Sequence, residues 1–209
     1  MYTGDNNDRL VDNWVLTSAG APPESWVGGN MQTSVDATNV TLIQNCKLFA
    51  YNPSAGIYQC PSVVPPTPAG GKIVPLRTVS MNARMGANLP GGTSTAGTVN
   101  TFTVLGAYPI FKKASQIKGP APVNALTFID ESINTLDDGI FFLAVSPGQT
   151  AWNSNFPSDR HSKGCSLAFA DGHSEHSKWH GLATENTYNA SAANCLPDLN
   201  KLENAIYTP

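Results

Sequence analysis

Charged residues are scarce in this chain: Asp, Glu, Lys and Arg make up 13% of its 209 residues, about half the usual share. The 12 basic residues and 15 acidic residues give a formal net charge of −3, and no basic block occurs in the sequence. Proteins that bind nucleic acid need clustered Lys and Arg to neutralise phosphates. The composition therefore argues against nucleic acid as a partner.

Long hydrophobic runs are also missing. The longest, at residues 139–145, covers about seven residues, whereas a membrane-spanning helix needs about 20. We therefore expect neither a membrane span nor a signal peptide within this sequence. Hydrophobic residues still make up 41% of the chain, which is enough for the buried core of one domain over residues 1–209. The 18 Gly and 16 Pro indicate a loop-rich surface, as in many extracellular proteins.

The motifs of common enzyme classes are absent as well. No G-x-S-x-G sequence is present to position a nucleophilic serine. Gly28-Gly29 and Gly91-Gly92 lie in expected loops, without the following helix that a phosphate-binding loop requires. We therefore expect a protein that is not an enzyme.

Cysteine is present four times, but never as a C-x-x-C pair. Cys46 and Cys60 enclose a short loop, and Cys165 and Cys195 lie in the C-terminal half. The even number predicts two disulfides in an oxidising compartment, each contributing about 2–4 kcal/mol. The alternative is four buried free thiols.

The pattern of apolar residues predicts an α+β fold with an antiparallel sheet of four to five strands and few short helices. Residues 1–36 look irregular, and Trp14 and Trp26 are expected to anchor them to the body. Strands are expected within 76–85, 125–130 and 139–145, the last two joined as a hairpin by the acidic loop 131–138. Helices are expected within 39–49, 111–117 and 197–207.

A second hairpin is expected within residues 160–180. The apolar run 165–170 is followed by Asp171-Gly172 and then by a polar run that ends at Trp179. Asp-Gly is typical of a two-residue type I′ turn, which would place Leu167 opposite His176. On that register the small Ala168 and Ala170 share one face, where they leave room for a helix to lie against the sheet.

Two groups of side chains are candidate metal ligands. In the acidic loop, five residues offer the oxygen ligands that calcium prefers: Asp130, Ser132, Asn134, Asp137 and Asp138. A solvated acidic turn is the alternative. Zinc is a second possibility at the histidines, although His173 and His176 would point to opposite faces of a strand. We expect His161 to have a structural role, through a hydrogen bond to Asp171 or to a backbone carbonyl.

His161, nine intervening residues and Asp171-Gly172 form an H-X9-DG pattern. Six further segments complete a resemblance that covers nearly the whole chain: MYTGDNNDRLVDNWV, SWVGGN, GIYQCPS, RTVSMNARMG, TFIDESINTLDDGIFFLAV and PDLNKLENA. In this order they resemble the prepilin-type, processing-associated H-X9-DG proteins, a pilin-like or pseudopilin-like family of verrucomicrobia and planctomycetes.

The resemblance implies the globular head of a pilin-like protein and a structural, non-catalytic role. The family's leader and long hydrophobic helix would precede Met1. A cysteine of that helix would be an alternative disulfide partner for Cys60. A prepilin peptidase would cleave the precursor. The helix would anchor it in the inner membrane, where it would pack with other pilin-like subunits and expose the head in the periplasm or at the cell surface. Ala168 and Ala170 would be the seat of that helix.

The alternative is a secreted or surface-tethered module that binds a glycan or a protein. Its stacking platforms would come from six aromatic residues: Trp14, Trp26, Trp152, Trp179, Tyr58 and Tyr188.

Overall fold

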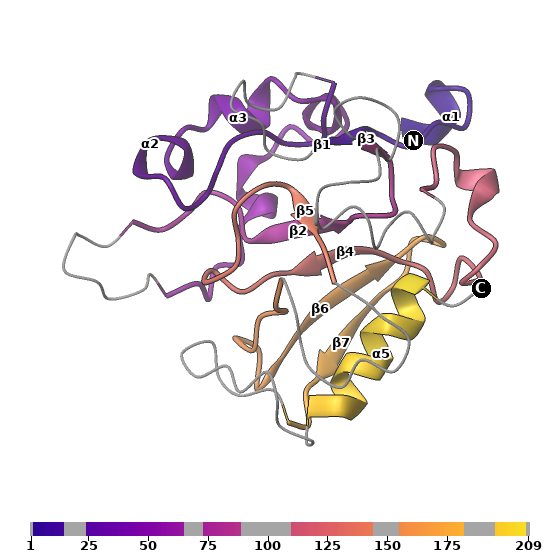
Figure 1. Ribbon diagram of the computed structural model, residues 1–209. Coiled ribbons are helices and arrows are strands. Elements are labelled where there is room, and N and C mark those ends of the chain that lie inside the picture. Colours follow the sequence, from indigo (N-terminus) through magenta and orange to yellow (C-terminus); the bar gives the residue numbers. More distant parts are fainter. Residues whose placement is uncertain are drawn as a thin grey trace, which may run out of the picture.

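The computed structural model describes residues 2–14, 24–64, 73–88, 110–143, 155–181 and 195–207. Its centre is a five-stranded sheet with the order β5-β2-β4-β6-β7 (Figure 1). The strands are β2 (Val79–Asn82), β4 (Leu126–Asp130), β5 (Ile140–Phe141), β6 (Gly164–Phe169) and β7 (Ser174–Lys178). Together with few short helices, this sheet gives the α+β class that the sequence predicted.

The sheet is mixed, which differs from the antiparallel sheet expected. β2 lies between β4 and β5, with Met81 opposite Phe128 of antiparallel β4 and opposite Ile140 of parallel β5. The predicted hairpin of 125–130 with 139–145 is therefore wrong. The loop 131–138 carries the chain past β2, and Arg77 holds the loop there through hydrogen bonds to the carbonyls of Asp137 and Asp138.

Helix α5 (Leu196–Tyr207) agrees with the helix predicted at 197–207. The other helices are short: α1 (Tyr2–Asp5), α2 (Ser34–Ala37), α3 (Thr41–Gln44) and the 3-10 turns η1 (Lys47–Tyr51), η2 (Ala55–Tyr58) and η3 (Ala114–Gln116). The single helix expected at 39–49 is broken at Cys46, whose backbone is extended. The break occurs where the Lys47 N–H donates to the Ser25 carbonyl, 3.1 Å away, and so leaves the helical pattern.

The N-terminal segment, which was expected to be irregular, forms short elements of its own. Strand β1 (Asn13–Trp14) pairs in parallel with β3 (Ala87–Asn88). Trp26 is buried, and its indole N–H lies 3.0 Å from Asn13 Oδ1 and 3.2 Å from the Gly139 carbonyl, so it anchors this segment as predicted.

Among the described residues, no helix has both the length and the hydropathy needed to cross a membrane.

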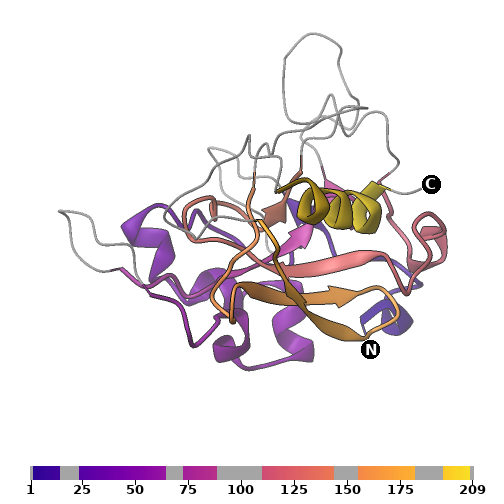
Figure 2. The same ribbon diagram turned by 90° about the horizontal axis from the view of Figure 1, so that it is seen from below.

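Two apolar cores lie on opposite faces of the sheet. One packs α5 against β4, β5 and β6, and it includes Leu167, Leu199 and Leu202. The other packs the N-terminal segment and the turns of residues 41–58 on the opposite face, and it includes Trp26 and Met81. Figure 2 shows α5 on one side of the sheet and the short helical turns on the other. Each face of the sheet therefore has its own cover.

The β6–β7 hairpin has a different turn from the one predicted. The Gly172 N–H donates to the Phe169 carbonyl at 3.0 Å, and the Phe169 N–H donates to the His173 carbonyl at 3.0 Å. Gly172 has a φ of 95°. This is a three-residue loop, in which a type I turn precedes a glycine with positive φ. The extra loop residue shifts the register by one, so Leu167 lies opposite Glu175 instead of His176.

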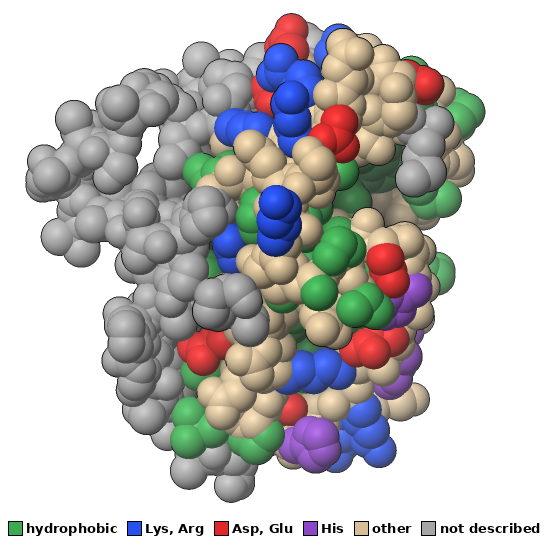
Figure 3. Space-filling view, turned by 90° about the vertical axis from the view of Figure 1, so that its right-hand side faces the viewer, with side chains coloured by type: hydrophobic (Ala, Val, Ile, Leu, Met, Phe, Trp, Pro, Cys, Tyr) green, Lys and Arg blue, Asp and Glu red, His purple; other side chains and the backbone are tan. Residues whose placement is uncertain are grey.

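The register shift places Trp179 on the α5 face with Leu167 and Phe169, and the small residues stay on the opposite face. Leu167, Phe169 and Trp179 are buried in the core under α5. Ala168 pairs with Ser174 and Phe128, and Ala170 packs against the opposite core. On the face shown in Figure 3, charged and histidine side chains lie around small groups of hydrophobic ones. Lys201 of α5 pairs with Glu175 of β7 at 2.9 Å.

Candidate functional site

His161 does not contact Asp171. Its Nε2 lies 3.1 Å from Cys60 Sγ and 3.7 Å from Asp130 Oδ2, whereas Asp171 Oδ1 lies 2.6 Å from Nδ1 of His173. The expected bond between the two ends of the H-X9-DG motif is therefore wrong. The reason is that all of β6 lies between them, and a six-residue strand spans about 20 Å.

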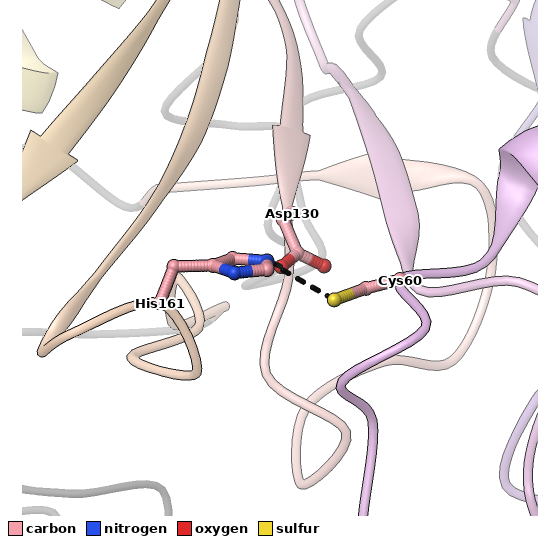
Figure 4. Close-up of side chains that lie close together, drawn as sticks. All are labelled: Cys60, Asp130 and His161. Atoms are coloured by element: carbon pink, nitrogen blue, oxygen red, sulfur yellow. Dashed lines mark hydrogen bonds and ion pairs between the residues drawn. The ribbon is translucent and has the colours of Figure 1, made fainter.

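Cys60, Asp130 and His161 form a compact cluster on three separate segments (Figure 4). Asp130 is the last residue of β4, His161 lies in the turn before β6, and Cys60 follows η2. The three ligand atoms all lie within 4.8 Å of one another. Cys60 and Asp130 are buried, while the His161 side chain is 34% exposed. The cluster is thus accessible from the histidine side alone.

Hydrogen bonds hold the Asp130 carboxylate in place before any ligand arrives. Ser158 Oγ donates to Asp130 Oδ2 at 2.7 Å, and the Arg160 guanidinium forms an ion pair with Oδ1. Arg160 Nη2 also donates to the Glu131 carbonyl at 2.9 Å. These bonds orient the carboxylate and leave Oδ2 directed at His161.

The other two members of the cluster are positioned by their backbones. The Cys60 N–H donates to Thr78 Oγ1 at 2.7 Å, which ties the cysteine to the residue just before β2. The His161 N–H donates to the Gly164 carbonyl at 3.0 Å, and its own carbonyl lies 2.8 Å from Nε2 of His176. Positive φ angles at Ser162 and Lys163 turn the chain between His161 and β6.

The geometry does not fit a nucleophile–base–acid relay. In such a relay the histidine contacts the nucleophile through one ring nitrogen and the orienting acid through the other. Here Cys60 and Asp130 both approach the same atom, Nε2 of His161. Three donor atoms directed at a common point are the arrangement of ligands around an ion.

The carboxylates of the predicted calcium set, Asp130, Asp137 and Asp138, form no group of three within metal-binding distance of one another. Cys60, Asp130 and His161 are the only group of at least three His, Cys, Asp or Glu side chains within metal-binding distance in the described part of the chain. Asp137 Oδ1 accepts from the Asp138 N–H at 2.7 Å, and Asp138 Oδ1 accepts from the Ile140 N–H at 2.8 Å. The side chains of this loop are thus used to stabilise its own backbone.

Two further members of the predicted calcium set are also turned inward or away. Ser132 is buried, and its Oγ accepts from the Asn134 N–H at 3.2 Å. Asn134 itself is exposed. The loop is therefore a hydrogen-bonded turn.

All four cysteines are free thiols in the structure, so the two expected disulfides are not formed. Cys46 Sγ donates to the Leu42 carbonyl at 3.2 Å, and Cys195 Sγ donates to the Gly181 carbonyl at 3.0 Å. Burial raises the pKa of Cys46 to about 11, and it also raises the pKa of Cys165. Cys165 lies near Asp130 and Arg160, whereas Cys60 contacts His161 directly.

A second feature is an apolar groove on the sheet face away from α5. It has a volume of about 360 Å³ and is lined mainly by aromatic and aliphatic side chains, namely Trp26, Leu48, Tyr51, Asn52, Ile57, Tyr58, Val79 and Phe128. Tyr51 and Ile57 are 44% and 56% exposed. Phe128, which lines the groove, pairs with Ala168 of β6, so a small residue lies next to a groove residue in the sheet.

The aromatic platforms proposed for glycan binding are not on the surface where the structure describes them. Trp26, Tyr58 and Trp179 are all buried. Trp152 and Tyr188 lie outside the described residues, as does the side chain of Trp14. Tyr51 and Ile57 are the more exposed side chains of the groove, and no sequence pattern singled them out.

Comparison with models of known protein families, with curated proteins and with solved structures finds no match to this chain.

Proposed function

We propose that this chain is the head of a pilin-like or pseudopilin-like structural subunit with no catalytic role. The observation that carries the proposal is the apolar groove opposite α5. It exposes Tyr51 and Ile57 beside a buried aromatic floor. Exposed apolar surface of this kind commonly marks a site covered by another element.

The occupant we propose is the long apolar helix that precedes the head in proteins of the family it resembles. A helix with its side chains is about 10–12 Å wide, and it needs small residues or a hollow to approach a sheet closely. The groove supplies the hollow, and Ala168 and Ala170 supply the small residues beside it. The sheet would then carry α5 on one face, and on the other this helix beside the N-terminal segment and the turns of residues 41–58.

The position of Tyr2 supports this assignment. Its ring lies edge-on to the ring of Tyr51, with centroids 5.3 Å apart, and Tyr51 lines the groove. A helix that ends just before residue 2 would therefore reach the groove without a long connection. The same helix would anchor the precursor in the inner membrane, and after cleavage by a prepilin peptidase it would pack with other subunits. The head would face the periplasm or the cell surface.

The reading frame upstream of residue 1 tests the class directly. We expect a prepilin leader followed by about 20 apolar residues. An upstream sequence without an apolar helix would overturn the proposal.

The groove itself is tested in the full-length precursor with Ile57→Glu. Ile57 is half-exposed in the head. We therefore expect the substitution to change the free energy of unfolding of the isolated head by less than about 0.5 kcal/mol. In the precursor, a charge facing the apolar helix should instead reduce filament yield in pelleting assays. Val35→Glu is the matched control, because Val35 is 74% exposed and lies outside the groove. Equal filament yields from the two variants would contradict the assignment, as would glycan or protein binding by the isolated head that Ile57→Glu abolishes.

A further inference from the structure

We propose that Cys60, Asp130 and His161 bind a single transition-metal ion of the zinc class. None of these three residues lines the apolar groove, and this inference does not rest on the proposed function. Tetrahedral zinc bonds of about 2.0–2.3 Å place neighbouring ligand atoms about 3.3–3.6 Å apart. The two measured separations, 3.1 Å for Sγ to Nε2 and 3.7 Å for Nε2 to Oδ2, lie close to that range.

The donor set selects the class of metal. One sulfur, one imidazole nitrogen and one carboxylate oxygen suit Zn²⁺ and its neighbours Co²⁺ and Ni²⁺, whereas Ca²⁺ and Mg²⁺ prefer oxygen alone. Binding would displace the Cys60 proton, so the thiolate and Asp130 would together offset the charge of the ion. Arg160, paired with Asp130 Oδ1, keeps the site from becoming strongly anionic when it holds no metal.

The surroundings of the ligands fit a metal site. Ser158 and Arg160 fix the carboxylate from behind, as second-shell groups do in metal centres. The partly exposed His161 ring gives the ion a route from solvent and leaves room for water as a fourth ligand. The metal would then join the Cys60 loop, the end of β4 and the turn before β6, linking residues 101 positions apart in sequence.

Titration of the chelator-treated chain with Co²⁺ tests the proposal. We expect one Co²⁺ per chain, with thiolate-to-cobalt charge-transfer absorption that added Zn²⁺ removes. Cys60→Ser and His161→Ala should each weaken Co²⁺ binding at least tenfold. Cys46→Ser and Asp171→Asn are the matched controls, because they replace a buried cysteine and the acid of the H-X9-DG motif outside the cluster. Both controls should bind as the parent does.

A second measurement does not depend on the folding of any variant. Iodoacetamide alkylation of the parent chain, followed by peptide mass spectrometry, should show Cys60 protected at least tenfold by Zn²⁺. Cys46 and Cys195, which contact other segments, should react at unchanged rates. The proposal is overturned if Co²⁺ binds without a charge-transfer band, if Cys46→Ser loses the band as Cys60→Ser does, or if Zn²⁺ does not slow alkylation of Cys60.

Discussion

The rings of Phe169 and His173 stack across the tip of the β6–β7 hairpin, with centroids 4.5 Å apart and planes 5° from parallel. The contact exists because the loop between them has three residues and not two. Phe169 and His173 therefore face each other as a hydrogen-bonded pair. The same register directs Trp179 toward α5, while Ala168 lies on the opposite face because side chains alternate along β6.

Gly172→Ala should destabilise this turn. Gly172 has a φ of 95°, and nothing lies within 4 Å of a Cβ added there. The penalty is therefore conformational and not steric, about 1–2 kcal/mol for a residue with a side chain. Urea unfolding of the variant measures it. Gly4→Ala is the matched control, because Gly4 has equally open space in α1 without a positive φ. An equal loss of stability in both variants would contradict the turn assignment.

Stability should fall as pH rises from about 4.5 to about 8 because of Glu131. Its side chain is buried, and burial raises its pKa from 4.5 to about 8. The positive charge of Arg77 lowers the pKa, but by less than burial raises it. Between these values the native state holds a proton that the unfolded state releases. Each pH unit in this range therefore removes about 1.4 kcal/mol of the free energy of unfolding at most. The contribution is complete below pH 4.5 and is lost by about pH 8.

Glu131→Gln should flatten this dependence and be more stable than the parent at pH 8 and above. Glutamine resembles the protonated acid, and its oxygen can accept the bonds that Thr135 Oγ1 and Asn155 Nδ2 now donate to Oε1, at 2.9 and 2.7 Å. Thermal unfolding from pH 5 to 9 measures the effect. The exposed acid Glu24, changed to Gln, is the control and should keep the parental slope. If the stability of Glu131→Gln fell with pH as steeply as that of the parent, this carboxyl would not be the titrating group.

Arg77→Met should destabilise the protein strongly. The buried guanidinium of Arg77 donates to the carbonyls of Val79, Asp137 and Asp138 at 2.9, 3.1 and 2.7 Å, and so joins the start of β2 to the acidic loop. Methionine fills similar space but leaves these carbonyls without a donor, at a cost of about 3–5 kcal/mol. Denaturant unfolding measures this loss. Lys118→Met, at an exposed cation, should change stability by less than about 0.5 kcal/mol.

The same arrangement predicts that calcium has no effect. Arg77 already supplies positive charge to the carbonyls of the acidic loop, and the loop carboxylates bind its own N–H groups. Millimolar Ca²⁺ should therefore leave the melting temperature unchanged. A rise on adding Ca²⁺, lost in Asp138→Asn, would restore the calcium interpretation.

The candidate site could be predicted from the sequence only one residue at a time. His161 was expected to be structurally important, Asp130 to be a metal ligand and Cys60 to pair with another group. His161 was assigned to Asp171 or a backbone carbonyl and Asp130 to the acidic loop, while the disulfide partner of Cys60 was left open. The actual partners lie on three segments. Two of them meet because β4 and β6 are antiparallel neighbours, so the last residue of β4 and the turn before β6 lie at the same end of the sheet.

The sequence by itself determined the local elements of this protein: α5, the cores of β2, β4 and β6, and the existence of a turn at Asp171-Gly172. Apolar periodicity and turn residues act over a few neighbouring positions, so one sequence suffices to locate them. The tertiary structure alone decided the order of the strands, the one-residue shift of the hairpin and the partners of His161. These depend on loops that cross the sheet and on contacts up to 101 positions apart, which no local pattern encodes.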